Sequence, residues 1–180
     1  MWWDRIEVGA EKRALALALI ERVPHWGWRE RTLRAASAAA LCNEQGWRGI
    51  FPNGARDAIW FISEVSDASM MLAFHASPAI CMSTVIAERL EQNAHLKPFV
   101  RKVMLYDLLH PIQAVRRMQR TAHAMLACMP RMDRAPSRFE VAALNAAYTV
   151  IVFVWLFDRT PGQILTSRTT ASATRLIGQR

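Results

Sequence analysis

The sequence predicts a soluble, nearly all-α protein that folds as a single domain. Alanine, leucine, arginine and methionine are abundant, and these residues lose little side-chain freedom in a helix. No stretch alternates apolar and polar residues with the β-branched enrichment of a strand. The apolar fraction of 52% and the charged fraction of 21% are those of a globular chain. One hydrophobic core surrounded by helices is therefore expected for these 180 residues.

Helical periodicity, prolines and capping residues predict about nine helices. Pro24 is expected to end the first helix, and Asn43 to cap the third with its side-chain oxygen. Ser77 is expected to cap the fifth, with Pro78 at its first position, where the missing N–H costs nothing. The expected helices cover residues 4–23, 32–41, 44–50, 55–74, 78–93, 98–109, 111–129, 139–157 and 163–177.

The first three expected helices have the outline of a helix-turn-helix, because two short helices joined by a tight turn follow a longer one. We expect residues 1–54 to form this helix-turn-helix-like three-helix part. Residues 55–180 are expected to form the remaining helical bundle, and the two parts to make one compact domain.

The chain carries a formal net charge of +8, and such a basic surface attracts phosphate in nucleic acid or in anionic lipid. Charge alone leaves both partners open. Cys42, Cys81 and Cys128 lack zinc-ligand or redox spacing, which fits a reduced cytoplasmic setting, and the first residues do not read as a signal peptide. Residues 141–157 are uncharged over nearly the length of a membrane span; we interpret them as a buried core or dimer helix.

Patterns that indicate catalysis are missing from the sequence. The five histidines are scattered, and none forms an i, i+4 pair or a Glu-x-x-His pair of the kind that binds metal. No glycine-rich phosphate loop and no Gly-x-Ser-x-Gly motif occurs. An enzyme acting on a lipid would need a cluster of polar groups in its cavity, and the sequence displays none. We therefore expect no enzyme activity, no cofactor and no metal.

Methionines gather in the second half of the chain. Eight of the nine lie between Met70 and Met132, and Met118, Met125 and Met129 follow one stripe of the seventh expected helix. Methionine is flexible and polarizable, so this pattern suits a cavity that adapts to an apolar guest. Ordinary core packing explains the same pattern.

Several stretches of the chain are similar to one known family. They are Ala-Leu-Ala-Leu-Ile-Glu-Arg-Val-Pro-His-Trp-Gly-Trp (16–28), Thr-Leu-Arg-Ala-Ala (32–36), Phe-Pro-Asn-Gly-Ala-Arg-Asp (51–57), Arg89-Leu-Glu91, Val100-Arg-Lys102, Arg120-Thr-Ala122, Tyr148 and Trp155-Leu-Phe-Asp158. In this order and spacing they resemble the Coq-nine family over about residues 12–178. Members of that family are TetR-like proteins that assist ubiquinone biosynthesis.

The resemblance implies a TetR-like fold, with a helix-turn-helix followed by a lipid-binding and dimerisation bundle. Family members hold an aromatic isoprenoid intermediate between their C-terminal helices and present it to a di-iron demethoxyubiquinone hydroxylase. The implied partners are an isoprenoid quinone or quinone intermediate, the hydroxylase, an anionic membrane surface and a second copy of the chain. The implied location is cytoplasmic, peripheral to the inner membrane of a bacterium. The residues expected to contact the lipid are Phe74, Met104, Leu105, Leu108, Met118, Met125, Tyr148, Val152 and Trp155.

The alternative function is that of a TetR-type DNA-binding transcriptional regulator. Such regulators usually follow the recognition helix with an aromatic residue, a Phe, a turn and a Lys that binds DNA phosphate. Here Gly54 occupies the Lys position, and Glu44 adds a carboxylate that phosphate repels. These residues disfavour sequence-specific DNA binding.

The chain departs from the family pattern in three places. Residues 139–142 lack the Trp and Tyr of the patch thought to dock the hydroxylase. His123 and Leu126 stand where the family tends to have an acidic residue and a Trp. The chain leaves no room after its last helix for the amphipathic membrane helix of eukaryotic members, so membrane contact is expected from the basic faces or from Trp2 and Trp3.

Overall fold

The computed structural model describes residues 6–42, 46–130 and 135–178, and the regular structure in these ranges is entirely helical. The described ranges contain nine α-helices and short 3₁₀ turns. The α-helices are α1 (Ala10–Trp26), α2 (Glu30–Ala39), α3 (Trp47–Ile50), α4 (Ala55–Ala73), α5 (Met82–Gln92), α6 (Lys97–Leu109), α7 (Pro111–Ala127), α8 (Arg138–Phe157) and α9 (Ile164–Gly178). The all-α expectation is therefore confirmed for the described part of the chain.

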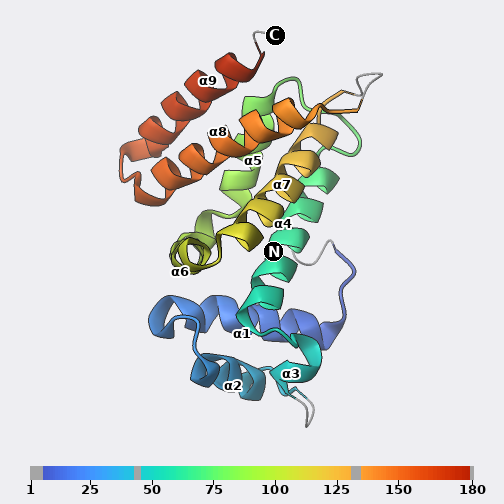
Figure 1. The fold of residues 1–180 in the computed structure, drawn as a ribbon, viewed down its shortest axis with the longest axis vertical. Helices are drawn as coiled ribbons and strands as arrows, with labels where there is room; N and C mark the ends of the chain where they lie inside the picture. The colour runs from blue at the N-terminus through green and yellow to red at the C-terminus, as the bar shows by residue number, and fades with distance from the viewer. Residues whose placement is uncertain (1–5, 43–45, 131–134, 179–180) are drawn as a thin grey trace.

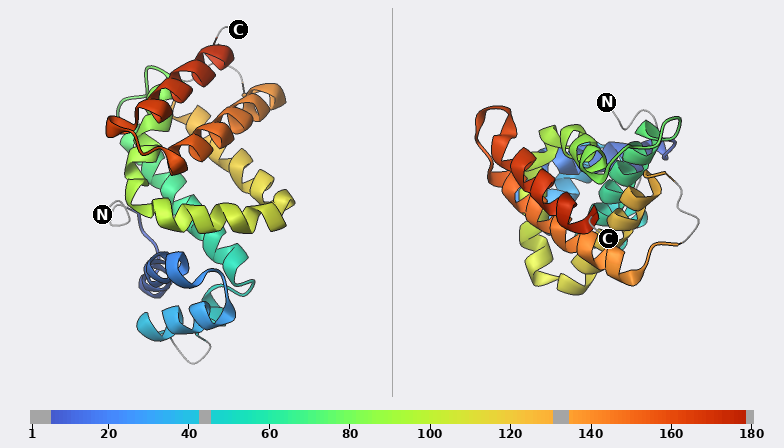
Figure 2. Two further views of the ribbon diagram at one scale, coloured as in Figure 1. Left: turned by 90° about the vertical axis from the view of Figure 1, so that its left-hand side faces the viewer. Right: turned by 90° about the horizontal axis from the view of Figure 1, so that it is seen from above.

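The helices form an elongated molecule with two centres of packing (Figure 1). Helices α1 to α3 lie at one end and α8 and α9 pack side by side at the other, while α6 crosses between the two ends (Figure 2). The N-terminal core, which includes Leu19, Phe51 and Phe61, continues past residue 54 to Phe99 on α6. The C-terminal core contains Met125 and other side chains of α4, α5, α7 and α8. Helices α4 and α6 thus connect the two cores.

Three expected helix ends are wrong. Helix α1 begins at Ala10, and residues 6–9, which were expected to be helical, precede it; Gly9 has a non-helical ψ of 133°. Helix α1 continues through Pro24 to Trp26 and ends at Gly27, whose positive φ of 69° reverses the chain. Pro24 costs little here because it removes one hydrogen bond, in the last turn. Helix α5 begins at Met82 and not at Pro78, because the preceding segment bonds to α7 instead: the Ala79 N–H donates to the carbonyl of Cys128 at 2.9 Å.

The third helix is short in the structure, covering four residues from Trp47 to Ile50. The expected cap Asn43 and its neighbour Glu44 lie outside the described residues, as do Trp2, Trp3 and residues 131–134. Helix α8 is long and apolar enough to cross a membrane by length and composition. In this fold one side of α8 is buried against the C-terminal core.

Helix α8 begins with a reciprocal capping box. The Ser137 hydroxyl accepts a hydrogen bond from the Glu140 N–H, and the Glu140 carboxylate accepts one from the Ser137 N–H at 2.7 Å. This box satisfies two N–H groups that the first turn would otherwise leave unpaired.

Replacing Ser137 by Ala is expected to lower the free energy of unfolding by about 1 kcal/mol, because it removes the cap. For a chain of this size the melting temperature falls by about 3 °C. Thermal unfolding followed by circular dichroism measures the effect. Ser172→Ala, at an exposed position on α9, is the control and leaves the melting temperature unchanged; an equal loss in both variants would contradict the capping role.

Candidate functional site

A cavity of about 770 Å³ lies among α4, α5, α6, α7 and α8. Most of its wall is apolar, with Ile62 from α4, Phe99 and Val103 from α6, Met118 from α7 and Val152 from α8. Pockets of about 300–1,000 Å³ with apolar walls are typical of small-molecule sites. The cavity therefore has the size and the surface to bury a largely apolar ligand.

The cavity opens to solvent near the junction of α6 and α7. Among its lining residues, Leu108 on α6 and Val115 on α7 are exposed, and so are Ala146 and Thr149 on the facing side of α8. Small alanine side chains on α8 leave this side open. We call this end the mouth. Arg117, which also lines the cavity, is paired there with the carboxylate of Asp107.

The inner end of the cavity is buried and polar, and the sequence analysis did not expect this. Its polar lining residues, which are less than a tenth exposed, are Ser66, Arg89, Asn93, Thr121 and Tyr148. Trp155 is 2% exposed and lines the same region, with its indole nitrogen buried. The expectation that the cavity lacks a polar cluster is therefore wrong.

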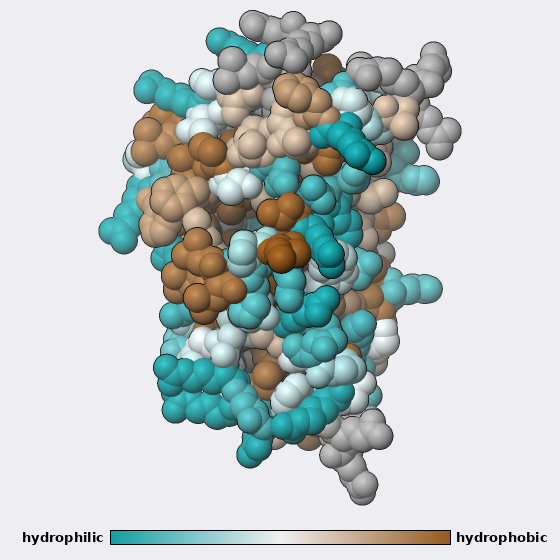
Figure 3. All heavy atoms as spheres, in the orientation of Figure 1, coloured by the Kyte–Doolittle hydropathy of each residue, from teal (hydrophilic) through white to brown (hydrophobic). Residues whose placement is uncertain are grey.

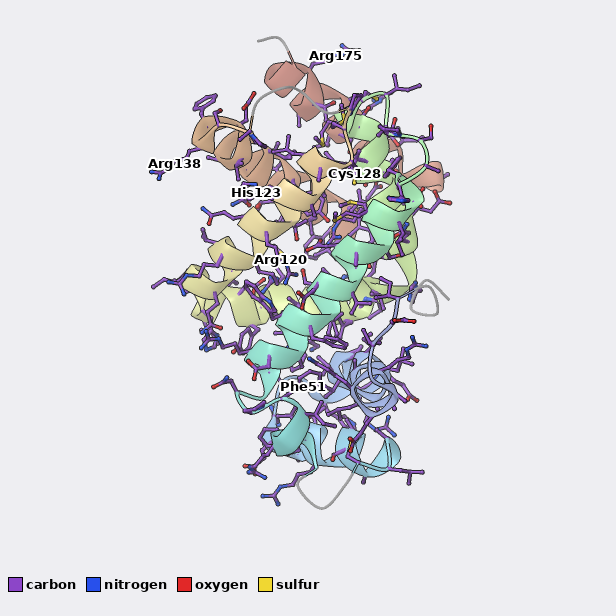
Figure 4. The ribbon with its side chains drawn as sticks, turned by 90° about the vertical axis from the view of Figure 1, so that its right-hand side faces the viewer. Phe51, Arg120, His123, Cys128, Arg138 and Arg175 are labelled. Carbon is purple, nitrogen blue, oxygen red and sulfur yellow. The ribbon has the colours of Figure 1, made fainter. Side chains whose placement is uncertain are left out.

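Asp67 on α4 organises this inner end although it is not itself part of the cavity wall. One of its carboxylate oxygens lies 2.6 Å from Arg89 Nη1, and the other lies 3.1 Å from Arg120 Nη2. The Thr121 hydroxyl donates to the same carboxylate at 3.1 Å. Figure 4 places Arg120 where α7 runs beside α4. A single carboxylate thus joins α4, α5 and α7.

Arg89 connects Asp67 with the polar residues of the cavity wall. Its Nε–H donates to the Tyr148 hydroxyl at 3.0 Å, and its main-chain carbonyl accepts from Asn93 Nδ2 at 2.8 Å. Asn93 and Ser66 also exchange hydrogen bonds. Burial raises the pKa of the Tyr148 phenol, against the lowering effect of Arg89, so the phenol stays protonated. Burial lowers the pKa of Arg89, but Asp67 and Tyr148 together raise it by more, so the guanidinium stays charged.

Six of the nine residues expected to contact a lipid line the cavity, namely Met104, Leu108, Met118, Tyr148, Val152 and Trp155. The other three do not. Leu105 is 58% exposed and is not part of the cavity wall, while Met125 is fully buried in the C-terminal core. Phe74 lies beyond the last turn of α4 and packs against that core.

Two arginines, one on α2 and one on α3, form ion pairs with the same carboxylate. The carboxylate of Glu30 accepts from both Arg34 and Arg48, at 2.7 Å each, on the surface of α2 and α3. These hydrogen bonds hold the pKa of Glu30 below its usual range. Exposed pairs of this kind are weak, and they are typical of a solvated surface.

Asp67 and Arg89 are the candidate site residues that sequence reasoning missed. Asp67 does carry a sequence signal, since it is a carboxylate within a face of α4 otherwise occupied by apolar and small residues. A charge at such a position predicts a buried partner. Arg89 carries no such signal because its partners lie 22 residues before it and, in Tyr148, 59 residues after it.

No group of three or more His, Cys, Asp and Glu side chains among the described residues is arranged to hold a metal ion. Comparison with models of known protein families gives no match, and no curated protein is similar to the chain at a significant level.

The different positions of two methionines on α7 give a test of the cavity. Met125→Arg is expected to lower the melting temperature by about 10 °C or prevent folding, because it buries an unpaired charge in the core. Met118→Arg faces open space and is expected to fold, with a melting temperature within about 3 °C of the original. Circular dichroism measures both. Unfolding of Met118→Arg alongside Met125→Arg would show that no open space exists at Met118.

Proposed function

We propose that this protein is a lipid-binding accessory protein of ubiquinone biosynthesis. It holds an aromatic isoprenoid intermediate and presents it to a demethoxyubiquinone hydroxylase, without catalysing a reaction itself. The cavity of about 770 Å³ is the observation that carries this proposal. The resemblance to the Coq-nine family supports the choice of lipid and pathway. Of its quoted residues, Arg89, Tyr148 and Trp155 line the cavity, and Arg120 is paired with Asp67 outside the cavity wall.

The physical basis is the poor solubility of prenyl chains. Each CH₂-sized group removed from water contributes about 0.8 kcal/mol, so a chain buried between α4 and α8 is strongly retained. Met104 and Met118 suit a wall that must fit a flexible guest, because methionine adapts its shape at little cost. The mouth between α6, α7 and α8 gives the chain a route in.

We also propose that the protein forms a homodimer, and an exposed apolar surface on α8 and α9 supports this. Phe153 and Phe157 on α8 are more than half exposed, and their rings contact each other at a tilt, with centroids 5.2 Å apart. Ile164 and Leu165, at the start of α9, are about half exposed. An exposed apolar strip on two adjacent helices is the composition expected of an interface between copies.

The proposed membrane contact is an apolar corner where α6 meets α7. The membrane corner consists of Leu105, Leu108, Leu109, Ile112 and Val115, all of them about half exposed or more. Figure 3 shows this apolar surface left of centre, on the face turned to the viewer. Lys102 and Arg116 flank it, and neither has an ion-pair partner among the described residues.

A bilayer surface with anionic lipid matches both the apolar side chains of the membrane corner and its flanking cations. Its apolar side chains insert at the boundary of the acyl chains, and each flanking cation adds about 1 kcal/mol near an anionic surface. Leu108 and Val115 belong to both the corner and the mouth. A lipid leaving the bilayer would therefore pass directly into the cavity.

Protein purified from a bacterial host is expected to carry isoprenoid lipid, because the cavity binds it in the cell. Mass spectrometry of organic extracts detects it, with Met118→Arg purified in the same way as the control. The folded control should carry much less. Repeated extracts of the unaltered protein that contain no more prenyl lipid than the control would contradict the proposal.

Ile112→Asp is expected to weaken binding to vesicles of phosphatidylcholine and phosphatidylglycerol about tenfold, through loss of one inserted side chain. Co-sedimentation measures the binding. Ile80→Asp is the matched control, since Ile80 is 94% exposed but lies outside the membrane corner. Equal binding by the two variants would place the membrane contact elsewhere.

A further inference from the structure

The inner end of the cavity holds one more positive charge than negative. Two guanidinium groups, of Arg89 and Arg120, share the single carboxylate of Asp67. Two positive charges and one negative charge leave an excess of one. The neighbouring groups do not cancel it, since burial keeps the Tyr148 phenol neutral and raises the pKa of the Cys128 thiol to about 11.

The same region offers hydrogen-bond donors that lack acceptors. The Tyr148 hydroxyl accepts from Arg89, and no described residue accepts the hydroxyl proton in turn. The buried Nε1–H of Trp155 also has no partner among the described residues. Both side chains line the cavity from α8, two helical turns apart. Buried donors are normally paired, so two unpaired ones beside an open cavity indicate a ligand with acceptor oxygens.

We propose that the cavity binds lipids with an ionised acid head group, and that the head lies against Arg89 and Tyr148 with its tail directed to the mouth. The inference rests on the proposed lipid-binding function and adds a class of ligand to it, because a quinone head supplies acceptor oxygens but no negative charge. A carboxylate supplies the missing negative charge and an acceptor for the Tyr148 hydroxyl. An ester supplies acceptor oxygens but no charge. An alcohol supplies a single acceptor oxygen and no charge.

The burial of Arg89 favours an ionised head group over a neutral one. Hydrogen bonds to ionised groups are the strong ones, and they gain strength where water is excluded. Arg89 is 5% exposed, so its field acts through protein and ligand and not through bulk water. Its Nε–H bond to Tyr148 polarises the hydroxyl, which makes the phenol a better donor to a carboxylate in the cavity.

Displacement of the neutral dye Nile red tests the proposal with three ligands that differ in the head group alone. They are geranylgeranoic acid, its methyl ester and geranylgeraniol, assayed near neutral pH where the acid is ionised. The acid is expected to displace the dye at a concentration about tenfold lower than the ester. Equal displacement by acid and ester would overturn the acid-head inference and leave the lipid-binding function standing. Failure of all three ligands would overturn the function itself.

Arg120→Gln tests the charge argument without touching the ligand site, since Arg120 lies behind Asp67 and is not part of the cavity wall. The substitution removes the excess charge and is expected to abolish the preference for acid over ester, with ester binding unchanged. Arg116→Gln, an exposed arginine on the same helix, is the control and keeps the preference. Persistence of the preference in Arg120→Gln would overturn the charge account.

Tyr148→Phe provides an independent variant that preserves side-chain volume. It is expected to lower the affinity for the acid about tenfold through loss of the donor, with little change for geranylgeraniol. Melting curves verify that each variant is folded. Equal loss for the acid and the alcohol would show that Tyr148 contributes packing and not head-group recognition.

Discussion

The carboxylate of Asp67 is the interaction on which the cavity depends. It holds α5 through Arg89 and α7 through Arg120 and Thr121, while Asp67 itself belongs to α4. An empty apolar cavity costs packing energy, so without these contacts the helices would be expected to move together and fill it. The Asp67–Arg89 pair is buried, and a buried ion pair that loses one partner destabilises a protein by about 3–5 kcal/mol. Arg120 is about a quarter exposed, so its loss is expected to cost less. The polar cluster thus sets the spacing of the helices as well as the chemistry of the cavity's inner end.

Cavity, mouth and surface form one continuous path. The inner end is polar and buried, the middle is apolar, and the mouth reaches solvent at Leu108 and Val115 beside the membrane corner. A molecule with a polar head and a long apolar tail matches this sequence of environments. The proposed functions of accepting, holding and presenting a lipid all follow from the same path, and none of them requires a reaction at the site.

Helical periodicity predicted most of the fold, because the apolar spacing of α4, α6, α7 and α8 is set by local sequence. It failed where distant contacts decided the local structure, as at Ala79, whose bond to Cys128 keeps residues 78–81 out of α5. Met118 and Met125 show the same limit for the site. They share a stripe of α7, yet one faces the cavity and the other the core. Arg89 was missed because its role depends on partners from α4 and α8 that no local pattern reveals.

A crystal structure of the protein with its co-purified contents tests the central claim most directly. We predict continuous electron density along the cavity, starting at Arg89 and Tyr148 and reaching the mouth at Val115, with the head atoms in hydrogen-bond contact at the inner end. A cavity filled by the protein's own side chains, with no separate density beside Met118 and Val152, would contradict the account.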